Sequence, residues 1–130
     1  MKRLAIMGST GSIGQSTLAV VAEHPEEFRV AGLAAGQNVQ VLADQVRQFR
    51  PPLVSVQDEA GAARLRDLLG PGAAPEILTG AAGVLQVATG AQADMVVSAM
   101  VGAVGLPPTL AAVEAGIPVA LANKETLVAA

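Results

Sequence analysis

Short apolar runs alternate with segments of helical periodicity along almost the whole chain, and glycine or proline marks most of the changes. The first run, Arg3 to Met7, stops at a glycine and suits a strand buried on both faces. Similar strands are expected at residues 28–36, 53–57, 76–80, 94–100 and 117–123. Helices are expected at residues 12–23, 39–49, 59–69 and 106–116, with a short one that ends at Val87.

Strands that alternate with helices across short turns predict βαβ crossovers, in which all strands run parallel. We therefore expect a doubly wound parallel sheet of the Rossmann type, with about six strands and helices on both faces. The 130 residues suffice for one domain, residues 1–130. The final letters LVAA are apolar and carry no cap, which predicts a domain truncated inside a helix.

Composition argues against several classes of protein. The net charge of −3 provides no basic surface for a nucleic-acid backbone. The chain has no cysteine, which excludes disulfides, thiolate metal sites and cysteine nucleophiles. The apolar run near the N-terminus is too short for a signal peptide or a membrane span. We expect a soluble, cytoplasmic protein with neither nucleic acid nor membrane as its partner.

The letters GSTGSIG follow the first predicted strand directly and open the first predicted helix. In a doubly wound sheet this turn faces the ligand crevice, where a helix N-terminus favours a pyrophosphate. Gly8 would make the turn, Gly11 would let the backbone approach the phosphates, and Gly14 would let helix and strand pack closely. Additional hydroxyl donors are expected from Ser9, Thr10 and Ser12. The spacing departs from GxGxxG, so a purely structural turn remains the alternative.

The end of the second predicted strand bears on the choice of dinucleotide. NAD-binding proteins of this type usually carry an acidic residue there for the ribose hydroxyls. This chain has none at residues 34–38, which favours NADP, because a carboxylate would repel the 2′-phosphate. Gly36, Gln37 and Asn38 offer backbone and amide donors instead, although no lysine or arginine accompanies them.

Two further segments follow predicted strands at the same edge. The small residues of SAMVGAVG would let a flat nicotinamide lie against the backbone, although a simple turn is equally compatible with them. In ANKET, Asn123 suits a helix N-cap and Glu125 an ordinary first-turn residue. Lys124 is unfavourable in the first turn of a helix, which predicts a substrate phosphate or carboxylate as its partner.

The remaining charged residues predict no catalytic or metal-binding group in this segment. Asp94 begins a strand at the wrong end of the sheet, and Glu114 lies in the middle of a helix. A solvated face is expected for Arg47, Arg50, Arg64 and Arg66. The chain has no tyrosine, which excludes the Tyr-x-x-x-Lys pair of short-chain dehydrogenases.

The segments GSTGSIGQSTLAVV, AAGQN, MVGAVGLPPTLAAVEAG and LANKETLV occur here in the order and spacing of one enzyme family. Over nearly its whole length the chain resembles 1-deoxy-D-xylulose 5-phosphate reductoisomerase, the NADPH-dependent enzyme of the non-mevalonate pathway of isoprene biosynthesis. The resemblance implies a pyrophosphate site at Thr10, Gly11, Ser12 and Ile13. It also implies that Gly36, Gln37 and Asn38 surround the 2′-phosphate, although the family often has lysine or arginine where this chain has Gln37.

The same resemblance implies that Ala99 and Met100 lie near the nicotinamide, that Asn123 and Glu125 contact NADPH, and that Lys124 reaches a sugar-phosphate substrate. Family members are much longer, usually form homodimers, and hold Mg²⁺ or Mn²⁺ through residues beyond this chain. The 130 residues are therefore expected to be the NADPH-binding part of such an oxidoreductase, inactive alone. Two alternatives are the NADP domain of a homoserine or semialdehyde dehydrogenase and a non-catalytic nucleotide-binding module.

Overall fold

The computed structural model describes residues 1–72, 74–100 and 106–121. Its strands are β1 (Lys2–Met7), β2 (Phe28–Ala34), β3 (Leu53–Val56), β4 (Glu76–Thr79), β5 (Met95–Ser98) and β6 (Val119–Leu121). Its helices are α1 (Ser12–Glu23), α2 (Val39–Phe49), α3 (Glu59–Leu69), α4 (Gly80–Gly90) and α5 (Leu106–Glu114). In the part of the chain so described, no helix is long and apolar enough to span a membrane.

All strands run parallel in a 6-stranded sheet with the order β4-β3-β2-β1-β5-β6. This confirms the predicted Rossmann-type sheet. The chain moves outward from β1 to β4, then returns through α4 to place β5 on the other side of β1. The strand order therefore reverses between β1 and β5, which is where open sheets of this kind bind ligands.

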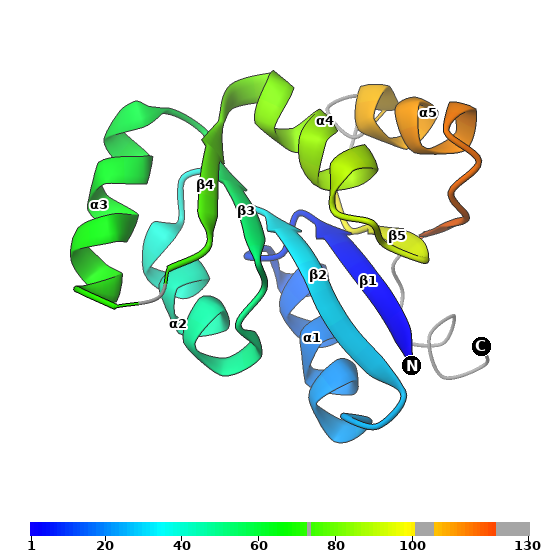
Figure 1. Ribbon diagram of the computed structural model, residues 1–130, viewed down its shortest axis with the longest axis horizontal. Coiled ribbons are helices and arrows are strands. Elements are labelled where there is room, and N and C mark those ends of the chain that lie inside the picture. Colours follow the sequence, from blue (N-terminus) through cyan, green and yellow to red (C-terminus); the bar gives the residue numbers. More distant parts are fainter. Residues whose placement is uncertain (73, 101–105, 122–130) are drawn as a thin grey trace.

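The two faces of the sheet have separate cores. Leu4, Leu33 and Val54 belong to a cluster that includes residues of α1, α2 and α3. On the other face, Met7 and Val96 pack with residues of α4 and α5. Figure 1 shows these two groups of helices on opposite sides of the sheet. Central strands buried on both faces explain why the strand sequences are continuously apolar rather than alternating.

A β-bulge interrupts the pairing of β1 with β2. Leu4 pairs with Val30 and Ala5 with Gly32, which leaves Ala31 as an extra residue in β2. The bulge brings Gly32 against α4, where a Cβ would lie 3.1 Å from Cγ1 of Val87. A side chain at position 32 would require Val87 and Ala91 of this region to shift slightly.

The predicted elements agree with the observed ones, with differences at several ends. The predicted helices 12–23, 39–49 and 59–69 have the observed bounds. Helix α4 continues past Val87 to Gly90, because Ala88 is buried against the sheet and Thr89 Oγ1 donates to the carbonyl oxygen of Leu85 at 2.8 Å. Strand β5 is shorter than predicted: Asp94 precedes it, at the amino end as expected, and accepts the Arg3 N–H.

Candidate functional site

The chain leaves β1 through a sharp turn at Gly8, which has φ of +83°. The backbone N–H groups of Gly8 and Ser9 both donate to the carbonyl oxygen of Ala34, at 2.8 and 3.1 Å. The turn is therefore attached to the carboxyl end of β2. A side chain at position 8 would strain this conformation, which confirms the turn-forming role expected for Gly8.

Helix α1 begins directly after this turn, with Gly11 as its N-cap and no side chain capping it. The first helical hydrogen bond runs from Gln15 N–H to the carbonyl oxygen of Gly11, at 2.9 Å. Within the described parts of the chain, no hydrogen-bond acceptor is found for the backbone N–H groups of residues 10–14. Unpaired N–H groups at the positive end of a helix dipole favour an anion, and a phosphate group fits this site.

Gly14 allows α1 to approach β1 and the turn. A Cβ at this position would lie 2.7 Å from both the carbonyl carbon and Cα of Ser9, and still closer to the carbonyl oxygen of Gly8. All of these are backbone atoms, so no side-chain movement would relieve the contact. The structure thus confirms that Gly14 lets helix and strand pack closely.

The expectation that Ser9 adds a hydroxyl donor at this turn is wrong. Ser9 is fully buried and its Oγ has no hydrogen-bond partner among the described residues, so it offers no hydroxyl to a ligand from solvent. Ile13, by contrast, is 41% exposed beside the turn.

Gln45 was missed from the sequence because it looked like one of several polar residues on α2. Its side chain is only 7% exposed, and Nε2 donates to the carbonyl oxygen of Ser9 at 2.7 Å. This hydrogen bond connects α2 with the glycine turn across 36 positions of sequence. The sequence did offer one signal: Gln45 lies between Leu42 and Val46, two apolar residues of the helix face that packs on the sheet.

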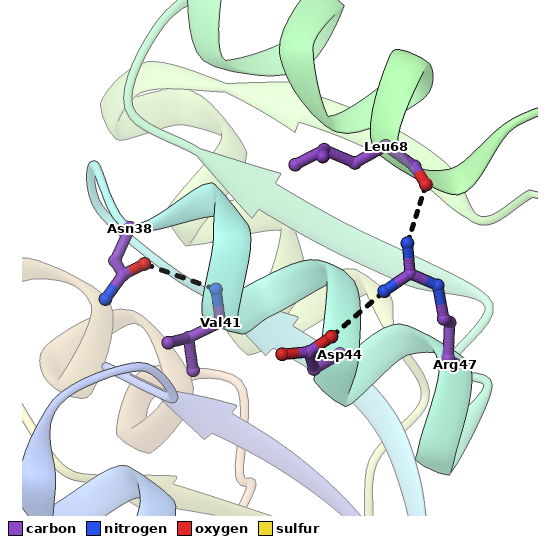
Figure 2. Close-up of polar contacts among 5 residues, drawn as sticks. All are labelled: Asn38, Val41, Asp44, Arg47 and Leu68. Carbon is purple, nitrogen blue, oxygen red and sulfur yellow. Dashed lines mark hydrogen bonds and ion pairs between the residues drawn. The ribbon is translucent and has the colours of Figure 1, made fainter.

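The carboxyl end of β2 brings a second set of predicted residues next to the turn. Gly36, Gln37 and Asn38 are all exposed there. Asn38 is the N-cap of α2, and its Oδ1 accepts the N–H of Val41 at 3.2 Å, as Figure 2 shows. Because the cap occupies Oδ1, the Nδ2 group of Asn38 is the part of the amide that remains as a donor.

Ala99 and Met100 form the other side of the turn, at the carboxyl end of β5. The N–H of Ala99 donates to the carbonyl oxygen of Met7 at 2.8 Å. A Cβ on Gly8 would lie 3.0 Å from the carbonyl carbon of Ala99 and 3.0 Å from Cγ of Met100. The structure therefore gathers the ends of β1, β2 and β5 around the glycine turn, at the point where the strand order reverses.

Three predicted residues, Asn123, Lys124 and Glu125, lie outside the described residues, as do the glycines of SAMVGAVG. No group of three or more His, Cys, Asp or Glu side chains suited to a metal ion is found among residues 1–72, 74–100 and 106–121. The gathered site is thus built from backbone donors, amides and small residues. Among the described residues, this site contains no side chain that could act as a general acid or base.

Comparison with protein families gives a match over residues 4–130 to a family model described as 1-deoxy-D-xylulose 5-phosphate reductoisomerase. The proteins of that name from Chlorobaculum tepidum and Chlorobium phaeovibrioides are 59% and 57% identical to the chain over all of its 130 residues. The chain spans 34% of the length of each of these relatives.

Two solved structures that resemble this chain are also reductoisomerases. A DOX-P reductoisomerase in complex with NADPH, fosmidomycin and magnesium is 38% identical, with a TM-score of 0.85 over 98% of this chain and 31% of that one. The reductoisomerase of Zymomonas mobilis in complex with NADPH is 36% identical, with a TM-score of 0.85 over 99% of this chain and 34% of that one.

Proposed function

Because the chain belongs to the 1-deoxy-D-xylulose 5-phosphate reductoisomerase family, we propose that residues 1–130 are the NADPH-binding domain of such an enzyme. The enzyme would convert 1-deoxy-D-xylulose 5-phosphate into 2-C-methyl-D-erythritol 4-phosphate by isomerisation and reduction. NADPH, when bound, supplies the hydride for the reduction. The chain's own residues would bind the nucleotide and orient it at the carboxyl edge of the sheet.

The observation that carries this proposal is the row of backbone N–H groups at residues 10–14, which have no acceptor among the described residues. They follow β1, at the point where the strand order reverses between β1 and β5. These residues fit a pyrophosphate because the donors are fixed by the fold rather than by flexible side chains. Gly8 and Gly14 keep the turn and α1 closely packed, because a Cβ at either position would meet backbone atoms of Ala99 or Ser9. Thr10, Gly11, Ser12 and Ile13 are accordingly proposed as the pyrophosphate site.

The neighbouring strand ends are proposed to hold the two ends of the nucleotide. Gly36, Gln37 and Asn38 would receive the adenosine 2′-phosphate, with Nδ2 of Asn38 as one donor. Ala99 and Met100, in contact with the turn on its other side, would lie along the nicotinamide. This assignment runs the nucleotide across the ends of β2, β1 and β5 in the order of the sheet.

The remaining parts of the activity are proposed for residues outside the described ones. Asn123 and Glu125 would contact NADPH, and Lys124 would bind the sugar-phosphate substrate. The described residues do not supply a metal site, so Mg²⁺ or Mn²⁺ would be held elsewhere in a longer enzyme. We also propose that the longer enzyme is a homodimer, which light scattering of a chain of the family's full length would test.

Calorimetric titration of this chain with NADPH and, in parallel, NADH tests the nucleotide site. We expect NADPH to bind at least about tenfold more tightly, which corresponds to about 1.4 kcal/mol. Substrate-dependent oxidation of NADPH in the presence of Mg²⁺ should be absent. A folded chain that binds neither nucleotide would contradict the proposed function, and turnover by this chain would contradict its proposed inactivity.

The Gln45→Leu variant tests the support of the turn by α2. Leucine keeps most of the volume but leaves the carbonyl oxygen of Ser9 without its buried donor, which costs about 1–3 kcal/mol of stability. We expect NADPH to bind about tenfold more weakly, since the backbone donors lose their fixed direction. Gln48→Leu, an exposed change on the same helix, serves as the control. Unchanged NADPH affinity in a folded Gln45→Leu protein would show that the contact does not position the turn.

The Gln37→Arg variant tests the proposed 2′-phosphate site. A guanidinium group at this exposed position would form charge-assisted hydrogen bonds with the phosphate. We expect the dissociation constant for NADPH to fall by about tenfold while that for NADH changes little. Gln86→Arg adds the same charge to an exposed site on α4 and should leave both constants unchanged. An equal gain for NADH and NADPH would place the 2′-phosphate elsewhere.

A further inference from the structure

A pocket of about 450 Å³ lies at the amino edge of the sheet, opposite the carboxyl edge where the nucleotide is proposed to bind. Arg3 of β1, Arg29 of β2 and Arg50 after α2 line it, together with Pro52 and residues of β2 and α2. None of the lining residues is acidic. Its volume falls within the range of small-molecule sites.

Arg3 and Arg29 occupy paired positions of neighbouring parallel strands. Such strands lie about 4.8 Å apart, and both side chains line the same pocket, so its local positive charge favours an anion. Nε of Arg3 is buried and has no hydrogen-bond partner among the described residues. Asp94 lies nearby, but its Oδ2 accepts the backbone N–H of Arg3 at 2.8 Å.

Arg50 contributes the third guanidinium group from a left-handed backbone conformation, with φ of 49° and ψ of 53°. A residue with a Cβ is strained there, whereas glycine adopts this conformation freely. Helices commonly end with glycine at such a position. An arginine at this position therefore costs stability, and its side chain lines the same pocket as Arg3 and Arg29.

The arginines of this pocket differ in their ion pairing from Arg47, which lies one helical turn before Arg50. Figure 2 shows that Arg47 already uses its guanidinium group, donating to Oδ1 of Asp44 at 3.0 Å and to the carbonyl oxygen of Leu68 at 2.6 Å. Arg3, Arg29 and Arg50 form no ion pair with any residue in the described ranges. Arg3 makes one side-chain hydrogen bond, from Nη2 to the carbonyl oxygen of Ala91 at 3.4 Å, and keeps its other guanidinium donors. Arg50 is exposed, as expected, so its guanidinium group is accessible at the pocket.

We propose that this pocket binds a small, multiply charged anion, and that a diphosphate group is the chemistry that fits it. Guanidinium groups bind phosphate oxygens through paired, charge-assisted hydrogen bonds, and positive groups on adjacent strands match a ligand of high negative charge. The site is separate from the glycine turn, and it stands independently of the proposed nucleotide domain.

The test follows the arginine Nε–Hε signals of the ¹⁵N-labelled chain by NMR during titration with sodium pyrophosphate. We expect the signals of Arg3, Arg29 and Arg50 to shift together and to saturate with one dissociation constant. Those of Arg64 and Arg66, exposed on α3, should stay in place. Arginine signals that do not saturate would overturn the proposal.

Two variants, whose folding can be checked separately by thermal unfolding, test the arginines directly. Arg29→Gln and Arg50→Gly should each weaken pyrophosphate binding at this pocket by about tenfold. Arg64→Gln, an exposed change of equal charge, should not. Arg50→Gly relieves the left-handed strain, so its melting temperature should be equal to or above that of the original chain. Wild-type affinity in both folded variants would overturn the proposal.

The backbone amide signals of residues 10–14 report the glycine turn in the same titration. Shifts confined to these amides would overturn the arginine site and support the proposed nucleotide site. Shifts confined to the arginines, with no binding of NADPH, would support the arginine site and contradict the nucleotide site.

Discussion

Replacing Gly14 by alanine should abolish NADPH binding and destabilise the fold by about 3 kcal/mol. The added Cβ would lie 2.7 Å from backbone atoms of Ser9, and neither α1 nor the turn can move without disturbing the other. If α1 shifts away, the backbone N–H groups of residues 10–14 lose the arrangement that suits a pyrophosphate. Thermal unfolding and calorimetric titration with NADPH measure the two effects.

Gly11→Ala is the matched control for this prediction. A Cβ at position 11 would have only the carbonyl oxygen of Gly8 nearby, at 3.8 Å, and the backbone there is extended with φ of −73°. We expect this variant to fold with nearly unchanged stability but to bind NADPH more weakly, because Gly11 belongs to the proposed pyrophosphate site and a methyl group there would limit the approach of the phosphates. A Gly14→Ala protein that binds NADPH like the original chain would refute the role assigned to the turn.

Replacing Leu33 by alanine should cost about 2–5 kcal/mol, a large part of the 5–15 kcal/mol that stabilises a typical domain. Leu33 lies between Ile6 of β1 and Val54 of β3 in the register of the sheet, and all three side chains are fully buried. The alanine would leave a cavity that neighbouring strands cannot close. Differential scanning calorimetry should show a melting temperature lowered by about 10 °C.

Leu110→Ala provides the comparison at a site of equal chemistry and different burial. Leu110 lies on α5 and is 50% exposed, so the same deletion should change stability by less than about 0.5 kcal/mol. Similar losses in the two variants would contradict the burial of Leu33 beneath the helices.

The sequence predicted the elements well where a local signal decides them. Asn38 caps α2 and Asp58 caps α3 through side-chain hydrogen bonds to the backbone, and both helices begin at the predicted residue. The end of α4 was missed because burial of Ala88 continues that helix, which is a tertiary effect. The bulge at Ala31 was missed because it depends on how β2 pairs with β1.

The candidate site likewise has features that the local sequence predicts and features that depend on tertiary contacts. The position of Gly8, Gly11 and Gly14 between a strand and a helix was sufficient to predict the turn. The position of Gln45 between the apolar Leu42 and Val46 could indicate burial of its side chain, but its partner Ser9 lies 36 positions away and cannot be found from a local pattern. The arginine pocket joins two strands and the end of a helix, and each arginine alone looks like an ordinary surface residue.

The pairing of β1 with β5 also affects how the protein is made. Residues 2–7 form a central strand, yet one of its two neighbours is a segment that begins at Met95. During synthesis, β1 to β4 can assemble with their helices while that edge of β1 is still unpaired. That edge of β1 is paired only once β5 has left the ribosome. The proposed nucleotide site needs the ends of β1, β2 and β5, so a nascent chain cannot be stabilised by a nucleotide there before β5 is made.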